Sequence, residues 1–430
     1  MADIPSNLWQ HPLQKHVWRP YSQMQTEALP LKVVRTEGVR LTLDDGRTLI
    51  DGVSSWWTAC HGYNHPHILA AVETQLRQMP HVMFGGLIHE PAIQLSEKLI
   101  KIAPQGMNRV FYSDSGSTAV EVAMKMALQY WQNKGKQKKD KFVCFRRGYH
   151  GDTFGAMSVS NPDESMHKAF RSNVSKQLVL DIPLDEYGLA EFQEMMQGIG
   201  SMAAGVIIEP LMQGAEGMNF YGADVLAAIY AAAKENDMLF IADEVATGFG
   251  RTGLMFACNE AGITPDIMCV GKALTGGVVP MAATLTREEI FEGFLSDNPE
   301  RALMHGPTYM ANPLGCAAGI ASIELFEQED RLAQVEAIEQ QLCDELAPCK
   351  KINSVKEVRV KGAIGVVEME SDTLDKNWLR QRFIDKGVWV RPLKNIIYIM
   401  PPLVIDSKDL HRLTQAMLEV ITEYSARKDT

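Results

Sequence analysis

Short apolar runs alternate with segments of helical periodicity between residues 109 and 285. Such alternation implies a largely parallel sheet whose faces are covered by helices. The helix after the first run is well marked, because apolar residues recur at helical spacing from Val120 to Trp131 and should lie on the sheet. The predicted strands are Val110–Ser113, Phe142–Phe145, Gly205–Ile208, Met238–Ala242 and Ile267–Val270.

The pattern changes near Phe326 to a long helix and then to a smaller α+β arrangement. Two strands, Val33–Thr36 and Leu41–Leu43, with the turn Asp44-Asp45-Gly46, predict a hairpin that joins the small domain. The predicted division is an N-terminal segment 1–75 contributing to the small domain, a large domain 76–325 and a C-terminal small domain 326–430. Further small-domain elements are expected at 355–360, 365–369, 377–386 and 388–391.

Composition excludes several classes of function. A net charge of −11 repels nucleic acid and anionic lipid, and no stretch is apolar enough for a membrane span. Seven cysteines without a C-x-x-C pair fit reduced thiols, and no secretory signal opens the chain. The sequence therefore predicts a cytoplasmic protein that acts on small molecules.

Two charged residues follow buried strands, at the sheet edge where open parallel sheets form their active sites. Asp243 ends one apolar strand, and Lys272 directly follows the next. Each has an ordinary alternative, since an aspartate can cap a turn and a lysine can reach solvent. Together they provide the acid and the amine that pyridoxal 5'-phosphate (PLP) needs for its ring nitrogen and its aldehyde.

Asp114-Ser-Gly-Ser-Thr118 follows the first strand and opens the amphipathic helix. Free backbone N–H groups, the helix dipole and the Ser117 hydroxyl would meet a phosphate there. The alternative is an ordinary helix start, and Thr118-Ala-Val-Glu121 matches a capping box.

Two competing motifs are weaker. Gly248-Phe-Gly-Arg-Thr-Gly253 satisfies the dinucleotide fingerprint, but four residues separate it from Asp243 and no clear helix opens at its end. His61, His65 and His67 cluster in sequence but lack the helical or strand spacing of metal ligands. We therefore expect neither a dinucleotide site nor a metal.

Two stretches resemble the signature of the class III PLP-dependent aminotransferases. They are Leu239–Gly253, which holds Asp243, and Pro265–Gly277, which holds Lys272. The resemblance covers nearly the whole chain and implies the PLP-dependent transferase fold type I, with a mostly parallel central sheet in a large domain and a smaller α+β domain. His305-Gly-Pro-Thr308 resembles the loop through which a neighbouring subunit closes the phosphate site, which implies a homodimer with shared active sites.

The resemblance also implies roles for single residues. Lys272, Asp243 and Tyr21 would be catalytic. Gly116 and Ser117 would bind phosphate, and Tyr149 would stack on the cofactor ring. The implied cofactor-binding set is Gly116, Ser117, Tyr149, Asp243, Lys272, Pro307 and Thr308, and the implied substrate-binding set is Trp56, Tyr149, Lys272, Gly306, Arg391 and Tyr398.

Less common stretches point to one group within this family. Among them are Trp18-Arg-Pro-Tyr21, Ser54-Ser-Trp-Trp57 and Ile397–Pro402. They resemble members that transfer the amino group of S-adenosylmethionine to 8-amino-7-oxononanoate (7-keto-8-aminopelargonate) in biotin biosynthesis. Tyr398 belongs to the pattern of members that use this donor rather than lysine. Members that use glutamate usually carry Gln-Gly-Glu, whereas Gln213-Gly-Ala215 lacks the glutamate, although Glu216 is adjacent.

The chemistry of these substrates agrees with the residues available. The acceptor is a long apolar chain ending in a carboxylate, so its pocket needs aromatic walls and one cation. Trp56, Trp57, Tyr21 and Arg391 can provide them. The alternatives are core packing for the aromatic residues and a structural salt bridge for Arg391.

Three other functions remain open on the sequence. The chain could be another class III aminotransferase acting on ω-amino acids or diamines, or an aminomutase. It could also be a catalytically inactive binding protein of the same fold, against which intact Lys272 and Asp243 argue.

Overall fold

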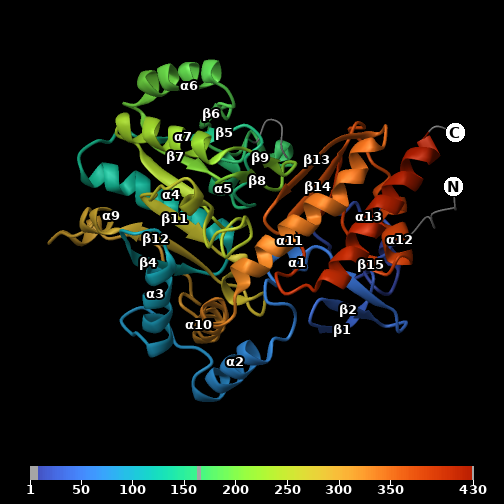
Figure 1. Ribbon diagram of the computed structural model, residues 1–430. Helices are drawn as coiled ribbons and strands as arrows, with labels where there is room; N and C mark the ends of the chain where they lie inside the picture. Colours follow the sequence, from blue (N-terminus) through green and yellow to red (C-terminus); the bar gives the residue numbers. More distant parts are fainter. Residues whose placement is uncertain (1–7, 162–165, 429–430) are drawn as a thin grey trace.

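The computed structural model describes residues 8–161 and 166–428 (Figure 1), so part of the N-terminus tested for a secretory signal lies outside them. A seven-stranded sheet has the order β4-β12-β11-β10-β7-β5-β6. Every pairing in it is parallel except those of β12, which runs antiparallel to β11 and β4. The strands are β4 (Met107–Ser113), β5 (Lys141–Phe145), β6 (Leu178–Leu180), β7 (Ala203–Ile208), β10 (Leu239–Asp243), β11 (Ile267–Val270) and β12 (Ala282–Arg287).

All five predicted strands are present, and the predicted mostly parallel sheet is confirmed. The sequence pattern did not predict two of the strands, β6 and β12. β6 is only three residues long and partly buried, and β12 reads Ala-Ala-Thr-Leu-Thr-Arg, without the run of large apolar residues that marks its neighbours. Because β12 is antiparallel to β11, no crossover helix precedes it.

Helices cover both faces of this sheet, as Figure 1 shows. α4 (Gly116–Asn133) packs on one face, against alternate strand residues such as Leu239 and Ile241. Phe240 and Ala242 point to the other face, which packs in a larger cluster with residues of α3, α6 and α7. The large-domain helices are α2 (Pro66–Gln78), α3 (Glu90–Ile102), α4, α5 (Phe154–Ser158), α6 (Glu186–Ile199), α7 (Ala223–Glu235), α8 (Ala257–Glu260), α9 (Glu288–Glu292) and α10 (Pro313–Gln328).

A second lobe contains two small sheets, with orders β1-β2-β3-β15 and β13-β14-β16. In the first, an N-terminal meander meets the C-terminal part of the chain, because β3 pairs with β15 in parallel. The elements are β1 (Val33–Glu37), β2 (Arg40–Leu43), β3 (Thr48–Asp51), α11 (Arg331–Leu346), β13 (Val355–Lys361), β14 (Ile364–Met369), α12 (Lys376–Asp385), β15 (Val388–Trp389), β16 (Ile396–Ile399) and α13 (Ser407–Lys428). A short hairpin, β8 (Met212–Gln213) with β9 (Asn219–Phe220), forms a fourth sheet.

Two local predictions need correction. The turn Asp44-Asp45-Gly46 connects β2 to β3, whereas β1 and β2 join at Gly38, whose φ of 56° suits a tight turn. The helix expected from about Phe326 onward is α11, which begins only at Arg331, since Asp330 caps it by accepting a hydrogen bond from Ala333 N, and Phe326 belongs to α10. The domain boundaries stay a prediction, and both fall within helices, in α2 and α10.

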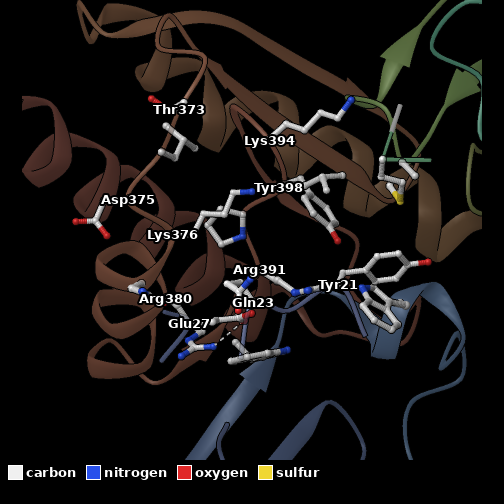
Figure 2. Close-up of a pocket in the computed structure, with 18 of the residues that line it drawn as sticks. Tyr21, Gln23, Glu27, Thr373, Asp375, Lys376, Arg380, Arg391, Lys394 and Tyr398 are labelled. Atoms are coloured by element: carbon white, nitrogen blue, oxygen red, sulfur yellow. Dashed lines mark hydrogen bonds and ion pairs between the residues drawn. The ribbon is translucent and has the colours of Figure 1, made fainter. Parts of the chain in front are cut away.

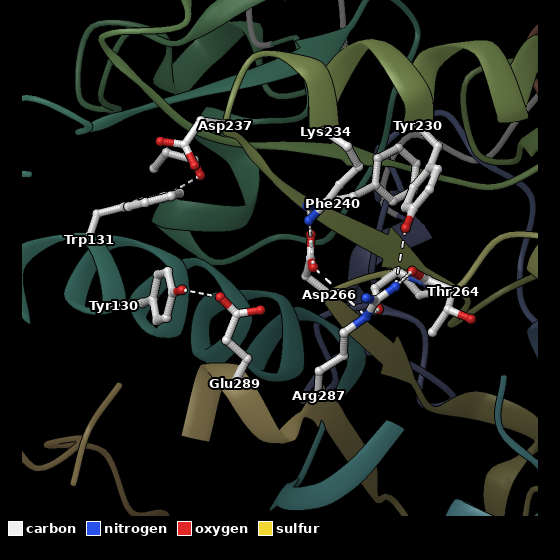
Figure 3. A network of polar contacts seen from close by, with 12 residues as sticks. Tyr130, Trp131, Tyr230, Lys234, Asp237, Phe240, Thr264, Asp266, Arg287 and Glu289 are labelled. Atoms are coloured by element: carbon white, nitrogen blue, oxygen red, sulfur yellow. Dashed lines mark hydrogen bonds and ion pairs between the residues drawn. The ribbon is translucent and has the colours of Figure 1, made fainter. Parts of the chain in front are cut away.

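Asp266 anchors the end of β11 that lies away from Lys272 (Figure 3). Its buried carboxylate accepts hydrogen bonds from Phe240 N and from Lys234 Nζ, all at 2.8 Å. Lys234 belongs to α7, so the Asp266 side chain ties this helix and two strands together.

Among the described residues, no helix is long and apolar enough to cross a membrane.

Candidate active site

The two charged residues singled out in the sequence lie at the carboxyl ends of adjacent parallel strands. Asp243 is the last residue of β10, and Lys272 follows β11 after Gly271. Lys272 opens a short 3-10 helix with a left-handed φ of 44°. This sharp change of direction ends the strand and turns the lysine toward a cavity.

The Asp243 carboxylate is buried and held from two sides. His150 Nδ1 lies 2.7 Å from one oxygen, and Val245 N donates to the other at 3.2 Å. Burial opposes the charged form of His150, but the hydrogen bond and charge of Asp243 outweigh it and raise the His150 pKa. Because an ionised carboxylate is costly to bury, the Asp243 side chain needs a cation or a bound proton nearby.

Behind this pair lies Glu209, a second buried carboxylate. It accepts hydrogen bonds from Tyr149 N and Gly214 N, both at 2.9 Å. Burial raises its pKa to about 7, and the charge of Asp243 adds to the rise. Glu209 therefore fixes the backbone on both sides of the cavity, at Tyr149 and beside Ala215.

The Lys272 amine is suited to react as a nucleophile. Its Nζ lies 4.1 Å from the centre of the Trp57 ring. Burial lowers its pKa to about 8, against the opposing charges of Asp243 and Glu209. A pKa this low leaves a sizeable neutral fraction of the amine near neutral pH.

The start of α4 faces the same region and is capped by a serine. Ser115 is the N-cap, and its Oγ accepts from Thr118 N at 3.2 Å, so the capping box considered as an alternative at Thr118–Glu121 is not the cap of this helix. Glu121 instead accepts from Gly155 N at 2.7 Å and so holds the start of α5. Ser117 Oγ accepts from Asp152 N at 3.2 Å.

Close packing at this helix start requires glycine. A Cβ at Gly116 would lie 2.7 Å from Val245, and one at Gly151, where φ is 127°, would lie 2.1 Å from Ser117 Oγ. The two glycines therefore allow the segments at Val245 and Gly151 to approach the first turn of α4 closely.

These groups fit PLP. The N–H groups at the start of α4 suit its phosphate, the buried Asp243 carboxylate suits a protonated ring nitrogen, and the Lys272 amine suits its aldehyde. Asp243, Gly116 and Ser117 do not line the main cavity, whereas Lys272 and Tyr149 do. The set accordingly has an inner part around Asp243 and the start of α4 and an outer part that lines the cavity.

The outer part is a cavity of about 880 Å³ between the two lobes (Figure 2). It is lined by seven of the predicted residues: Tyr21, Trp56, Trp57, Tyr149, Lys272, Arg391 and Tyr398. Figure 2 shows Glu27 and Arg380, which are 3.4 Å apart, at its outer wall. This outer wall, built from residues 23–27 and 372–380, was not expected from the sequence.

Aromatic rings line the cavity around Arg391. The guanidinium lies 5.0 Å from the centre of the Trp56 ring, and Tyr21 packs edge-on against the same ring at 6.0 Å. Tyr398 meets Trp57 in a similar way at 6.4 Å. Within residues 8–161 and 166–428, Arg391 has neither a hydrogen bond nor an ion pair, so the structural salt bridge considered for it is absent there.

Asp152 is a residue that the sequence reasoning missed. Tyr149 OH donates to its carboxylate at 3.0 Å, His167 Nε2 lies 2.8 Å away, and Tyr21 OH donates to its other oxygen. The His167 contact is the largest cause of a lowered Asp152 pKa. The run Gly-Tyr-His-Gly-Asp152 after β5 was the available signal, but only its tyrosine was assigned a role.

Some predicted residues lie elsewhere. Gly306, Pro307 and Thr308 do not line the cavity of their own chain, and His305 at the start of their loop lies 3.0 Å from Lys125. The Gly248–Gly253 segment is a series of turns. The three histidines make separate contacts: His61 with Arg331 and Ser322, His65 with Glu329, and His67 with Glu324.

Comparison with known proteins agrees with this geometry. The family model described as aminotransferase class III matches residues 21–421. The adenosylmethionine-8-amino-7-oxononanoate aminotransferase of Buchnera aphidicola (subsp. Acyrthosiphon pisum) is 44% identical over 95% of this chain and 96% of its own.

Two solved structures have the same fold. The adenosylmethionine-8-amino-7-oxononanoate aminotransferase of Methanocaldococcus jannaschii superposes with a TM-score of 0.92 at 35% identity, covering 97% of this chain and 98% of its own. The omega transaminase of Pseudomonas jessenii, in complex with PMP, has a TM-score of 0.88 at 27% identity, covering 96% and 97%. The chain therefore belongs to the class III aminotransferases, a family of PLP-dependent enzymes.

Proposed function

We propose that this enzyme transfers the amino group of S-adenosylmethionine to 8-amino-7-oxononanoate and so forms 7,8-diaminopelargonate in biotin biosynthesis. The relatives that share more than two fifths of its sequence carry this activity in their names. The observation that carries the proposal is Arg391, a pocket cation without an acidic partner among the described residues and flanked by aromatic rings.

The acceptor fits this arrangement because it combines a carboxylate with a long apolar chain. Arg391 would bind the carboxylate through two parallel hydrogen bonds, and Trp56 and Tyr21 would cover the chain. The keto carbon would then face Lys272. A cavity of about 880 Å³ also leaves room for the larger donor, whose sulfonium and adenine suit aromatic faces.

The position of Glu216 supports a donor other than glutamate. Ala215 lines the cavity, while the Glu216 carboxylate is buried and forms an ion pair with Lys394. The adjacent glutamate therefore does not take the place of the missing Gln-Gly-Glu glutamate.

The chain's own groups account for the proton transfers. When bound, PLP supplies an aldehyde for the amine and an electron-accepting ring. Lys272 would bind the aldehyde and, once freed by a substrate amine, carry a proton to and from the substrate α-carbon, a task that its pKa of about 8 favours. Asp243, oriented by His150, would keep the ring nitrogen protonated. Tyr149, fixed by Glu209 and Asp152, would cover the ring face.

We further infer a homodimer in which Gly306, Pro307 and Thr308 complete the partner's site. These residues do not reach the cavity of their own chain. They lie between exposed apolar residues, with Met304 79% exposed and Tyr309 61% exposed, and Trp18 is 92% exposed. Surfaces of this kind mark protein interfaces.

The seven unpaired cysteines favour a reducing compartment, and we place the enzyme in the cytoplasm.

The donor assignment is tested by offering S-adenosylmethionine, lysine, glutamate and diamines singly to the PLP-loaded enzyme. Only S-adenosylmethionine should bleach the visible cofactor band, and subsequent addition of 8-amino-7-oxononanoate should restore it and yield 7,8-diaminopelargonate by mass spectrometry. Conversion by lysine instead would refute the donor but leave the aminotransferase assignment standing.

Arg391→Ala should weaken the acceptor half-reaction by about 2–5 kcal/mol, as for truncation of a buried charge pair. Tyr398→Phe is the matched comparison, because it removes one hydroxyl from another residue that lines the cavity and should impair the donor half-reaction more than the acceptor one. Single-turnover spectra measure the two halves separately. Equal effects of Arg391→Ala on both halves would contradict its role as the acceptor's carboxylate site.

Shared active sites are tested by subunit mixing. Inactive Lys272→Ala chains refolded with Thr308→Val chains should regain activity, because each hybrid dimer contains one site with both residues intact. Mixing Lys272→Ala with Asp243→Asn is the control and should give no recovery, since each change disables the site of its own chain and neither site of the hybrid is intact. Failure of the first mixture, with hybrids confirmed, would show that each site is built within one chain.

A further inference from the structure

Four successive residues that are not glycine have left-handed backbones in the short helical turn α1 (Ser54–Trp57). Their φ values are 48°, 48°, 55° and 73° from Ser54 to Trp57. L-residues avoid this conformation because it brings Cβ too close to the following carbonyl oxygen, and it normally occurs at single positions. A run of four persists only where the surroundings enforce it.

The turn is enforced mainly by Asp51, the fully buried last residue of β3. One carboxylate oxygen accepts from Val53 N at 2.8 Å, and the other accepts from Ser55 N at 3.1 Å and from Tyr63 OH at 2.6 Å. Tyr63 OH also lies 2.5 Å from Ser55 Oγ. The Asp51 carboxylate thus binds both Val53, just before the turn, and Ser55, the second residue of the turn.

Both lobes of the molecule hold the turn in place. Ser54 Oγ donates to Met400 O at 2.7 Å, which ties the turn to the small lobe. In the large lobe, Gly277 packs so closely that a Cβ there would lie 2.9 Å from Thr58 Oγ1. Gly277 lies a few residues after Lys272, so the turn is positioned relative to the reactive lysine.

The consequence is that two adjacent tryptophans enter the cavity in different directions. The Trp57 ring lies 4.1 Å from Lys272 Nζ, and the Trp56 ring lies 5.0 Å from the Arg391 guanidinium. In a right-handed turn the two side chains would leave the backbone in other directions, and this pair of contacts would be lost.

We propose that Asp51 is a positioning residue that sets substrate fit by holding residues 54–57 in the left-handed turn. For the identity of the substrates, the proposal rests on the function given above. Asp51 itself does not line the cavity, and its effect passes through Trp56 and Trp57.

Asp51→Asn tests the proposal with little change of volume. The amide NH₂ would face the N–H of Val53 or Ser55, so one bond becomes a donor–donor contact and the turn relaxes. We expect kcat/KM to fall by roughly 10–100-fold, mainly through KM, as for misplaced substrate-positioning groups. The near-ultraviolet circular dichroism of the cofactor-free protein should also lose tryptophan fine structure.

The matched control is Asp266→Asn, since Asp266 is another buried aspartate that accepts from a backbone N–H, at the far end of β11. It should lower the melting temperature and leave kcat/KM and the tryptophan signal unchanged. A rescue variant adds Ser55→Gly to Asp51→Asn. Glycine adopts left-handed φ without strain, so kcat/KM and the dichroism should recover in large part.

Wild-type kcat/KM in Asp51→Asn, an equal loss in Asp266→Asn, or no recovery in the double variant would each overturn the proposal. If Asp51→Asn does not fold, Tyr63→Phe removes one of the carboxylate's three donors and should raise KM in the same direction. All comparisons use whichever donor and acceptor the wild type converts, so an incorrect substrate assignment would appear in the wild type and not in these ratios.

Discussion

The buried carboxylate of Asp243 is the interaction on which the site depends. It lies at the end of an apolar strand, where an unpaired anion would be costly, and His150 and Val245 N hold it in one orientation. The adjacent strand delivers Lys272, whose amine loses much of its preference for the charged form through burial. A parallel sheet thereby places a fixed acid and a reactive amine at the carboxyl ends of two paired strands.

The second lobe completes the site by bringing distant parts of the chain together. Tyr21 precedes β1, the two tryptophans follow β3, and Arg391 and Tyr398 come from around β15 and β16. Pairing of β3 with β15 joins these segments, because Asp51 lies beside Trp389 in that ladder. The small lobe therefore provides much of the cavity lining, whereas Asp243 and Lys272 belong to the large lobe.

Much of the large-domain sheet and the two charged residues at its edge could be predicted from the sequence. The strands that end at Asp243 and Val270 are apolar runs that lead into a charged residue, Asp243 itself in the first and Lys272 just after Gly271 in the second, so both pattern and chemistry were visible. β12 was not visible, because Ala-Ala-Thr-Leu-Thr-Arg contains only one large apolar residue and does not form such a run. The left-handed turn at 54–57 could not be found either, since it contains no glycine and is imposed by Asp51 and Tyr63. Asp152 was missed because its role depends on Tyr21 approaching from a remote segment.

The central claim is that Asp243 and Lys272 act together on one cofactor, and Asp243→Asn tests it most directly. The amide occupies nearly the same space but cannot hold a proton on the ring nitrogen. The measurement is the nitrogen-15 chemical shift of PLP labelled at its ring nitrogen, bound to wild type and variant. We predict a protonated shift in the wild type and an unprotonated shift in Asp243→Asn, with PLP still retained and activity largely lost. A protonated shift in both proteins, with full activity, would show that another residue faces the ring nitrogen.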